Sequence, residues 1–270
     1  MQINNHRLTG EGVSWQPSPN HGGPFDEGLP DCIVLHYTGG SSLQSSADHL
    51  CEPETSASAH LVVGRDGQVI QLVPFDTVAW HAGDSSYAGR HGYNRYAIGI
   101  EMDNAGPLTR NGNHYTAWFG RQYAREEVVE AVHRNGGPSR FWHAYTEAQI
   151  ARVREICRLL IGTYTINSIL GHEEIAPQRK IDPGPAFPLD KFRQSLLASS
   201  RAGEGKAQTT RLGMVEASYL NLRSEPSVSA ITVAQPLPRG TLLDVIEERD
   251  GWCRVDVRME GWVMKKYIKV

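Results

Sequence analysis

The sequence lacks an excess of charge of either sign. Its 270 residues carry 27 Lys and Arg against 30 Asp and Glu, for a formal net charge of −3. A nucleic-acid-binding protein needs a basic surface to neutralise phosphates, so we expect no nucleic-acid partner. The chain also lacks an apolar run long enough to span a membrane. Its first ten residues do not have the basic and then apolar layout of a secretory signal peptide. We therefore expect a protein that is cytoplasmic or exported by a non-standard route.

Cysteine is scarce and its spacing is wide. The four cysteines, Cys32, Cys51, Cys157 and Cys253, never form a C-x-x-C pair, which excludes a cysteine-rich zinc knuckle. We expect free and mostly buried thiols, although two disulfides remain compatible with this spacing. With 40% apolar residues, the chain is long enough to bury a core without disulfides or oligomerisation. We therefore expect a monomer.

One segment lacks large apolar side chains altogether. Residues 199–210 (SSRAGEGKAQTT) are small, polar or charged, which is typical of a flexible linker. This segment predicts two domains, at residues 1–198 and 211–270. In the second domain, short strand-like runs are separated by turns such as Pro238-Arg239-Gly240, and no helical stretch follows. That pattern predicts a small all-β barrel.

The first domain alternates strand-like runs with helical patterns. Residues 32–37 (CIVLHY) and 97–102 (AIGIEM) are short continuous apolar runs, which are typical of buried central strands. Residues 60–73 read as two strands around Asp66-Gly67, a dipeptide that closes hairpins because glycine tolerates positive φ. These patterns predict the α/β class, with a central mixed β-sheet flanked by helices.

Two further segments carry structural predictions. Apolar residues recur at helical spacing over residues 146–164, and Thr146 and Gln149 stand at the positions of a capping box. Residues 104–143 are rich in glycine, aromatic residues and histidine, with one helix-like piece near residues 121–133. This region is either a cover beside an active site or a structural insertion.

Two histidines and an aspartate are candidates for metal binding. His36 closes an apolar strand, and His172 and Asp182 lie ten residues apart in a later segment. A catalytic zinc ion needs about three protein ligands and one open position, and two imidazoles with one carboxylate supply that set. The gap between His172 and Asp182 is too long for neighbouring turns of one helix, so a loop must return Asp182. We predict that these three residues bind one Zn²⁺ ion.

A glutamate and a lysine are candidates for catalysis. Glu101 lies inside an apolar strand, where an unpaired carboxylate costs several kcal/mol or shifts its pKa. It could accept a proton from water and pass it to a leaving amine. Lys180 could stabilise a developing oxyanion. Taken singly, His36 would be a core histidine and Lys180 a solvated cation, so the combination carries the prediction.

Five strings in this order and spacing resemble the type-2 N-acetylmuramoyl-L-alanine amidases over about residues 31–192. They are VLHYTGG, SAHLVVGRDGQVIQLV, AWHAG, IGIEMDN and GHEEIAPQRKIDPGPAF. The resemblance implies a fold similar to that of peptidoglycan recognition proteins. It implies that His36, His172 and Asp182 bind zinc and that Glu101 and Lys180 are catalytic. The implied reaction cleaves the amide between the muramic acid lactyl group and the first alanine of the stem peptide, in peptidoglycan or muropeptides.

The same resemblance gives expectations for the substrate groove. His60 and His81 fall in the strings SAH and AWHAG, and we expect them to shape the groove together with Tyr37 and Trp80. The phage-lysozyme branch of the family uses cysteine as its third zinc ligand, whereas this chain has Asp182. The chain is thus more similar to the branch that acts on muropeptides, including 1,6-anhydro forms.

The C-terminal segment resembles a bacterial SH3-like domain. LNLRSEP, Gly251-Trp252 and Gly261-Trp262-Val263 stand in the expected order. Such modules bind cell-wall peptides and would hold an enzyme near polymeric substrate. Trp252 and Trp262 are either wall-binding residues or residues of the barrel core.

Two alternatives to the amidase remain open at this point. A recognition protein on the same fold would bind wall fragments without cutting them, although the complete zinc set weakens this reading. A zinc peptidase would cut within the stem peptide by the same metal chemistry. Residue patterns also leave open whether the substrate is intact wall or soluble fragments, and whether the role is recycling, phage lysis or that of an effector.

Overall fold

The computed structural model describes residues 1–203, 211–249 and 251–258, which form two compact units, Met1–Arg201 and Ala202–Val270. The last helix of the first unit, α4 (Leu189–Gly203), extends into the predicted linker. Residues 199–203 are therefore helical, and the rest of that prediction lies outside the described residues. Serine, arginine and alanine here tolerate a helix, and no proline ends it before Gly203.

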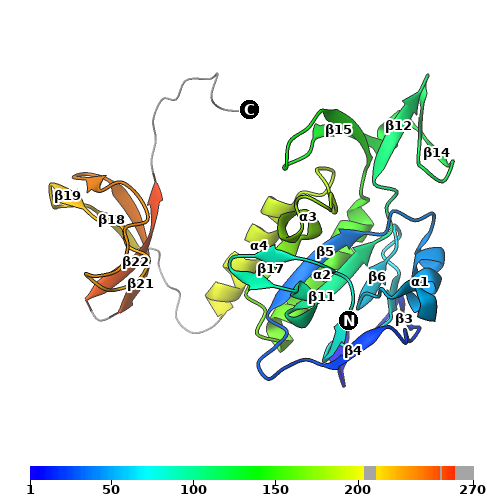
Figure 1. Ribbon diagram of the computed structural model, residues 1–270, viewed down its shortest axis with the longest axis horizontal. Helices are drawn as coiled ribbons and strands as arrows, with labels where there is room; N and C mark the ends of the chain where they lie inside the picture. Colours follow the sequence, from blue (N-terminus) through cyan, green and yellow to red (C-terminus); the bar gives the residue numbers. More distant parts are fainter. Residues whose placement is uncertain (204–210, 250, 259–270) are drawn as a thin grey trace. The chain divides into compact units, whose positions relative to one another are not determined.

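A six-stranded mixed sheet forms the centre of the first unit (Figure 1). Its strand order is β17-β5-β11-β6-β7-β3, and every pair is parallel except the antiparallel β6-β7 hairpin. The mixed sheet flanked by helices confirms the predicted fold class. The strands are β3 (Val13–Trp15), β5 (Cys32–Tyr37), β6 (Leu61–Val63), β7 (Val69–Gln71), β11 (Ala97–Met102) and β17 (Ser168–Gly171).

The two faces of this sheet bury different groups. Side chains alternate across a strand, so Ile33 and Leu35 of β5 point to one face and Val34 and His36 to the other. The first face packs against α2 (Glu147–Thr163) and α4 in the largest apolar core. The second face is covered partly by α1 (Leu43–Cys51) and leaves room for polar side chains.

Local signals account for the hairpin and for helix α2. Gly67 has φ +85° in the turn between β6 and β7, which confirms the predicted hairpin. Thr146 caps α2 by accepting a hydrogen bond from the Gln149 amide (3.1 Å). The reciprocal half of the predicted capping box is absent from the described contacts, because the Gln149 amide side chain donates to Val63 and Asp103 carbonyls instead. Tertiary acceptors thus replace the local one.

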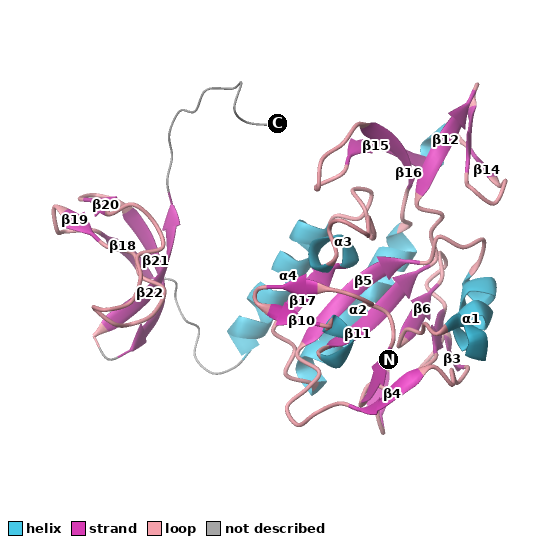
Figure 2. Ribbon diagram, in the orientation of Figure 1, coloured by secondary structure: helices cyan, strands magenta, loops and turns pink. Residues whose placement is uncertain are grey.

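The segment after β11 forms a second, five-stranded antiparallel sheet, and the helix predicted near residues 121–133 is wrong. That stretch contains strand β14, one 3₁₀ turn and strand β15, which carries Val128, Val129 and Val132. The order is β14-β13-β12-β16-β15, and Figure 2 shows this insertion sheet apart from the central sheet. Its strands are β12 (Pro107–Asn111), β13 (His114–Thr116), β14 (Gln122–Tyr123), β15 (Val128–Val132) and β16 (Ser139–His143).

The second unit is built from short strands around a small apolar core. A three-stranded sheet has the order β18-β21-β22, and β19 pairs with β20. Val215, Leu237 and Leu243 are the buried residues of this core. The strands are β18 (Arg211–Met214), β19 (Tyr219–Leu220), β20 (Leu237–Pro238), β21 (Leu242–Arg249) and β22 (Trp252–Arg258).

The remaining elements of the first unit are short. They are the pairs β1 (Gln2–Asn4) with β2 (Arg7–Thr9), β4 (His21–Pro24) with β8 (Thr77–Ala79) and β9 (Ser86–Tyr87) with β10 (Arg90–His91), helix α3 (His172–Ile175), and the 3₁₀ turns η1 (Pro53–Thr55), η2 (Tyr93–Arg95) and η3 (Arg125–Glu127). Within the described ranges, no helix combines the length and apolar character needed to cross a bilayer.

Candidate metal centre

Three neighbouring parallel strands bring the candidate residues to one edge of the central sheet. His36 lies near the end of β5, Glu101 near the end of β11, and His172 directly follows β17. His36 and Glu101 are paired in register, so their side chains leave the sheet on the same face. Ligands of α/β proteins commonly bind at the carboxyl ends of parallel strands.

Asp182 joins this group through a loop, as the sequence predicted. The chain leaves helix α3 after Ile175 and returns so that the Glu173 amide donates to the Asp182 carbonyl (2.8 Å). Asp182 Oδ2 then lies 3.0 Å from His36 Nδ1 and 3.0 Å from His172 Nδ1, and the two ring nitrogens are 2.9 Å apart. All three residues are buried.

These distances suit a small cation. Tetrahedral zinc with bonds of about 2.0–2.1 Å holds its ligand atoms roughly 3.3 Å apart, close to the spacing of the three atoms here. Burial lowers the pKa of His36 to about 4, so the ring stays neutral. Burial acts to raise the pKa of Asp182, but contacts with His172 and His36 outweigh it and hold that pKa well below its usual range. The neutral His36 ring, the His172 imidazole and one carboxylate therefore converge, and this donor set fits zinc.

Outer hydrogen bonds direct the free lone pair of each histidine toward the centre. His172 Nε2 donates to the Ala82 carbonyl (3.1 Å), which leaves Nδ1 unprotonated. His81 Nε2 donates to the Ala97 carbonyl (3.0 Å), so the neutral His81 ring accepts at Nδ1 from His36 Nε2 (3.0 Å). His36 Nδ1 is thus also a lone-pair donor for a metal.

His81 therefore positions a ligand. Its ring packs against Gly99, where an added Cβ would lie only 2.4 Å from His81 Cγ, so glycine is required at that position. His81 was predicted to shape the substrate groove. Its contact with His36 gives it a second role, which is to orient a candidate metal ligand.

We expect His81→Phe to weaken zinc binding by about 10- to 100-fold, because the variant keeps a ring against Gly99 but leaves His36 Nε2 without its acceptor. Competition with a chromophoric chelator measures the affinity. His143→Phe is the matched control, since His143 is a buried histidine of the insertion sheet that is hydrogen-bonded to the Ala105 amide. Equal zinc affinities of folded wild type and His81→Phe would contradict this role.

Glu101 is the carboxyl group without a partner in this site. Its Oε2 atom is buried and has no hydrogen-bond partner among the described residues. Burial raises the pKa of Glu101 to about 8, the charge of Asp182 adds to this shift, and Lys180 opposes it. A carboxyl group with a pKa near neutrality can both accept and donate a proton.

A cavity of about 310 Å³ contains most of the predicted site residues. Tyr37, Trp80 and Lys180 line it together with Glu101 and two of the three converging residues, His172 and Asp182. The structure thus places Tyr37 and Trp80 where a substrate could meet them. Lys180 brings a positive charge to the same space.

His60 does not fit its predicted place in the substrate groove. It has no exposed surface, its Nε2 donates to the Thr77 carbonyl (2.9 Å), and its Nδ1 accepts from the Gly99 amide (3.0 Å). Burial lowers the pKa of His60 to about 4. Both ring nitrogens therefore serve the backbone, and His60 joins β8 to β11 behind the site.

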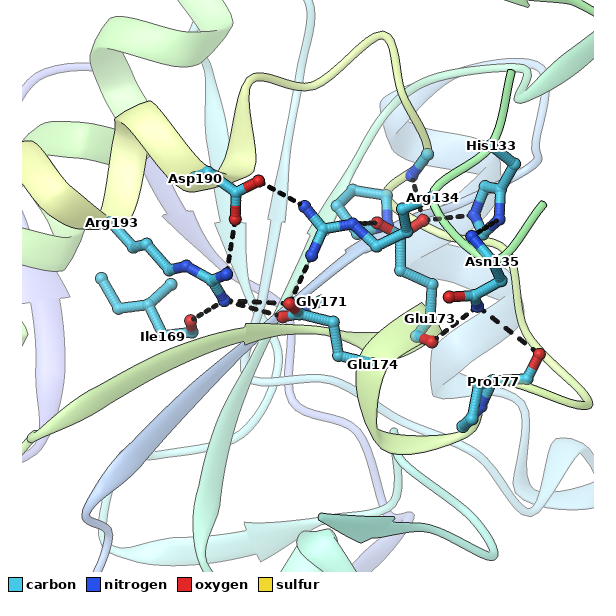
Figure 3. A network of polar contacts seen from close by, with 12 residues as sticks. His133, Arg134, Asn135, Ile169, Gly171, Glu173, Glu174, Pro177, Asp190 and Arg193 are labelled. Atoms are coloured by element: carbon cyan, nitrogen blue, oxygen red, sulfur yellow. Dashed lines mark hydrogen bonds and ion pairs between the residues drawn. The ribbon is translucent and has the colours of Figure 1, made fainter. Parts of the chain in front are cut away.

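An ion-pair network that the sequence reasoning missed braces the metal-binding segment (Figure 3). Glu173, next to His172, is buried and pairs with His133 and with Arg134 Nε (3.0 Å) of the insertion sheet's β15-β16 turn. Arg134 also pairs with Glu174, and the Asn135 side chain donates to the Glu173 carbonyl (2.9 Å). The insertion therefore holds helix α3 in place. Two consecutive glutamates after His172 were the only local signal.

The sequence reasoning also missed two aromatic residues of the insertion. Trp118 and Phe119 line a second cavity that contains Glu101. An adjacent Trp-Phe pair in a polar, glycine-rich stretch was the available signal, but which surface it faces depends on the fold.

The fold and the site define a class: an α/β protein with a buried His-His-Asp site at the ends of parallel strands and an uncompensated carboxyl group beside it. Hydrolytic metalloenzymes use this combination of three protein ligands and a nearby acid or base.

Comparison with known proteins identifies the family. The family described as N-acetylmuramoyl-L-alanine amidase matches residues 26–185, and the bacterial SH3 domain family matches residues 218–269. The chain belongs to the N-acetylmuramoyl-L-alanine amidase family, whose members are hydrolases, and carries a C-terminal bacterial SH3 domain.

Individual relatives agree with this assignment. The 1,6-anhydro-N-acetylmuramyl-L-alanine amidase AmpD of Salmonella typhimurium (strain SL1344) is 30% identical over 203 residues, covering 68% of this chain and 90% of AmpD. The N-acetylmuramoyl-L-alanine amidase AmiD of Escherichia coli (strain K12) is 30% identical over 171 residues, covering 60% of this chain and 51% of AmiD. A crystal structure of a selenomethionine derivative of AmpD matches with a TM-score of 0.50 and 29% identity, covering 73% of this chain and 99% of AmpD.

The two tryptophans proposed for wall binding lie in the SH3 domain. Trp252 is half-buried at the start of β22, opposite Arg249 of β21. Trp262 lies outside the described residues. Their roles stay predictions.

Proposed function

We propose that this enzyme is a zinc-dependent amidase that cleaves the bond between N-acetylmuramic acid and L-alanine in peptidoglycan or its soluble muropeptides. The observation that carries the proposal is the convergence of His36 Nδ1, His172 Nδ1 and Asp182 Oδ2 within 2.9–3.0 Å of one another, with His172 and Asp182 lining one cavity with Glu101. The activities printed in the names of AmpD and AmiD support the choice of bond.

His36, His172 and Asp182 would hold the ion. When bound, zinc supplies Lewis acidity that makes a water molecule nucleophilic near neutral pH and polarises the amide carbonyl.

Glu101 would move the proton. In its ionised form it accepts a proton from the attacking water, and it then delivers that proton to the nitrogen of the leaving alanine. Lys180 lowers the pKa of Glu101, and the positive charge of a bound zinc ion would lower it further. The ionised form of Glu101 would then be populated near neutral pH.

Lys180 would stabilise the negative charge that develops on the carbonyl oxygen. It lines the cavity that also contains Glu101, His172 and Asp182. A fixed positive charge in a partly desolvated cavity acts more strongly than it would in water. Since one chain supplies every group of this site, we also propose that the enzyme acts as a monomer.

The C-terminal domain would hold the enzyme near its substrate. A tethered wall-binding module raises the local concentration of polymer at the catalytic unit. This role favours intact peptidoglycan as a substrate in addition to soluble muropeptides.

Product analysis tests the proposed bond. The zinc-loaded enzyme, given purified sacculi or soluble 1,6-anhydro-muropeptides, is expected to release stem peptides that begin with a free L-alanine amine, as seen by mass spectrometry. A peptidase that cuts within the stem would instead leave alanine on the muramic acid. Absence of free stem peptide from both substrates would contradict the proposal, and the preferred substrate would show whether the wall or its fragments are used.

A further inference from the structure

A second cavity of about 610 Å³ adjoins the cavity of the metal centre. The two share Thr38, Leu50 and Glu101, so Glu101 lies where they meet. A substrate cut at this point must extend from Glu101 in two directions. The larger cavity is therefore placed to receive the part of the substrate on one side of the scissile bond.

Trp118 of the insertion sheet gives this cavity a flat apolar wall. Its side chain is 80% exposed, yet its indole Nε1 donates to the Gly39 carbonyl (2.7 Å) in the loop that follows β5. Phe119 packs edge-on against it, with ring centroids 5.6 Å apart and an interplanar angle of 87°. The indole is thus held in one orientation with a face open, which lowers the entropy cost of binding a ligand there.

Hydroxyl groups supply polar partners in the same cavity. Ser46 Oγ is buried, lines the cavity and has no hydrogen-bond partner among the described residues. Ser41, Ser45 and Asp48 lie along the same wall. An apolar ring face beside hydroxyl and carboxylate acceptors matches the chemistry of a pyranose, which has a C–H face and a rim of hydroxyl groups.

Charge separates the two cavities. Among the described residues that line the larger cavity there is no lysine or arginine, whereas Asp48, Glu52 and Glu101 are acidic. The cavity of the metal centre contains two bases, Arg179 and Lys180, beside the acids Glu101 and Asp182. Stem peptides carry free carboxylates, so the cavity with Arg179 and Lys180 suits the stem, and the cavity without a lysine or arginine suits an uncharged sugar.

We propose that Trp118 forms a glycan subsite, in which the indole face packs on the sugar that neighbours the muramic acid in a glycan strand. This inference rests on the proposed amidase function. It makes the enzyme prefer substrates that keep at least a disaccharide, and it assigns that preference to the insertion sheet.

Two substrates with the same peptide test the subsite: N-acetylmuramoyl-L-alanyl-D-isoglutamine, and its disaccharide form with N-acetylglucosamine attached. We expect Trp118→Ala to raise KM for the disaccharide by about tenfold, the upper end for one aromatic contact. The kcat on both substrates and the KM for the monosaccharide should stay within about twofold of wild type. Trp118→Phe should recover part of the loss, and Tyr87→Ala, which removes an exposed aromatic residue of the β9-β10 pair, should have no effect.

The outcomes separate the subsite from the amidase function. If wild type releases no stem peptide from either substrate, the amidase proposal fails. If wild type cuts both but Trp118→Ala changes neither KM, or changes both equally, only the subsite is overturned. A second measurement uses wild type alone and therefore does not depend on whether the alanine variant folds. Addition of N,N′-diacetylchitobiose should shift the indole N–H signal of Trp118 in NMR spectra. An unshifted signal at saturating sugar also overturns the subsite.

Discussion

Glu101→Gln is expected to lower kcat by about a thousandfold, in the middle of the range for general acid–base catalysis. Glutamine keeps the shape of the side chain but neither accepts the proton of the attacking water nor donates one to the leaving amine. Because Glu101 Oε2 makes no hydrogen bond in the described structure, the substitution breaks no contact that supports the fold. The measurement is the rate of stem-peptide release, with zinc content determined on the same sample.

Zinc content is expected to be unchanged in Glu101→Gln, because Glu101 is not among the three converging ligands. Glu126→Gln is the matched control, since Glu126 is an exposed acid of the 3₁₀ turn η3 and lines neither cavity. It should retain wild-type kcat. A Glu101→Gln variant whose kcat stays within tenfold of wild type would contradict the proton-transfer role, and loss of zinc in that variant would mean that Glu101 supports the metal.

Asp182→Ala is expected to weaken zinc binding by roughly a thousandfold or more, since losing a direct ligand should exceed the 10- to 100-fold cost of losing an outer partner. Asp182 supplies the only carboxylate oxygen of the converging set and contacts both histidines at 3.0 Å. Without it, only the two imidazoles remain, and three protein ligands are the usual minimum for a catalytic zinc site. Activity at stoichiometric zinc should be lost.

Removal of zinc from wild type by chelation should cause the same loss of activity as Asp182→Ala. Treatment with a strong chelator should abolish stem-peptide release, and stoichiometric zinc should restore it in wild type but not in Asp182→Ala. Asp48→Ala, which removes a carboxylate from the neighbouring cavity, is the control and should keep zinc binding. Full activity of the metal-free wild type, or a normal zinc content in Asp182→Ala, would contradict the proposed metal site.

Much of the fold could be predicted because the relevant signals are local. The apolar runs of β5 and β11, the Asp66-Gly67 turn and the cap at Thr146 each depend on residues close in the chain. The helix predicted near residues 121–133 was wrong because the spacing of its valines is compatible with a helix and with a strand. The pairing of β15 with β16 decided in favour of the strand. The predicted linker was partly wrong because small polar residues do not by themselves end a helix.

The candidate metal ligands could be named from the sequence because their types and spacing are specific, and the structure brings the three together. His60 shows the limit of such reasoning. It stands in a family motif beside a strand, but whether its ring reaches a groove or the backbone behind it depends on how β8 and β11 pack around it. The Glu173 network and the Trp118 wall were missed for the same reason, since their partners lie far away in the chain.

By itself, the sequence determined the fold class, the hairpin and the identity of the residues that can hold zinc, because turn chemistry, periodicity and ligand type are properties of short segments. Only the tertiary structure decided which nitrogen of each histidine faces the centre, that Glu101 lies between two cavities of different charge, and that an inserted sheet supplies one wall. Those features arise from hydrogen bonds and burial between segments far apart in the chain, and no local pattern encodes such distances.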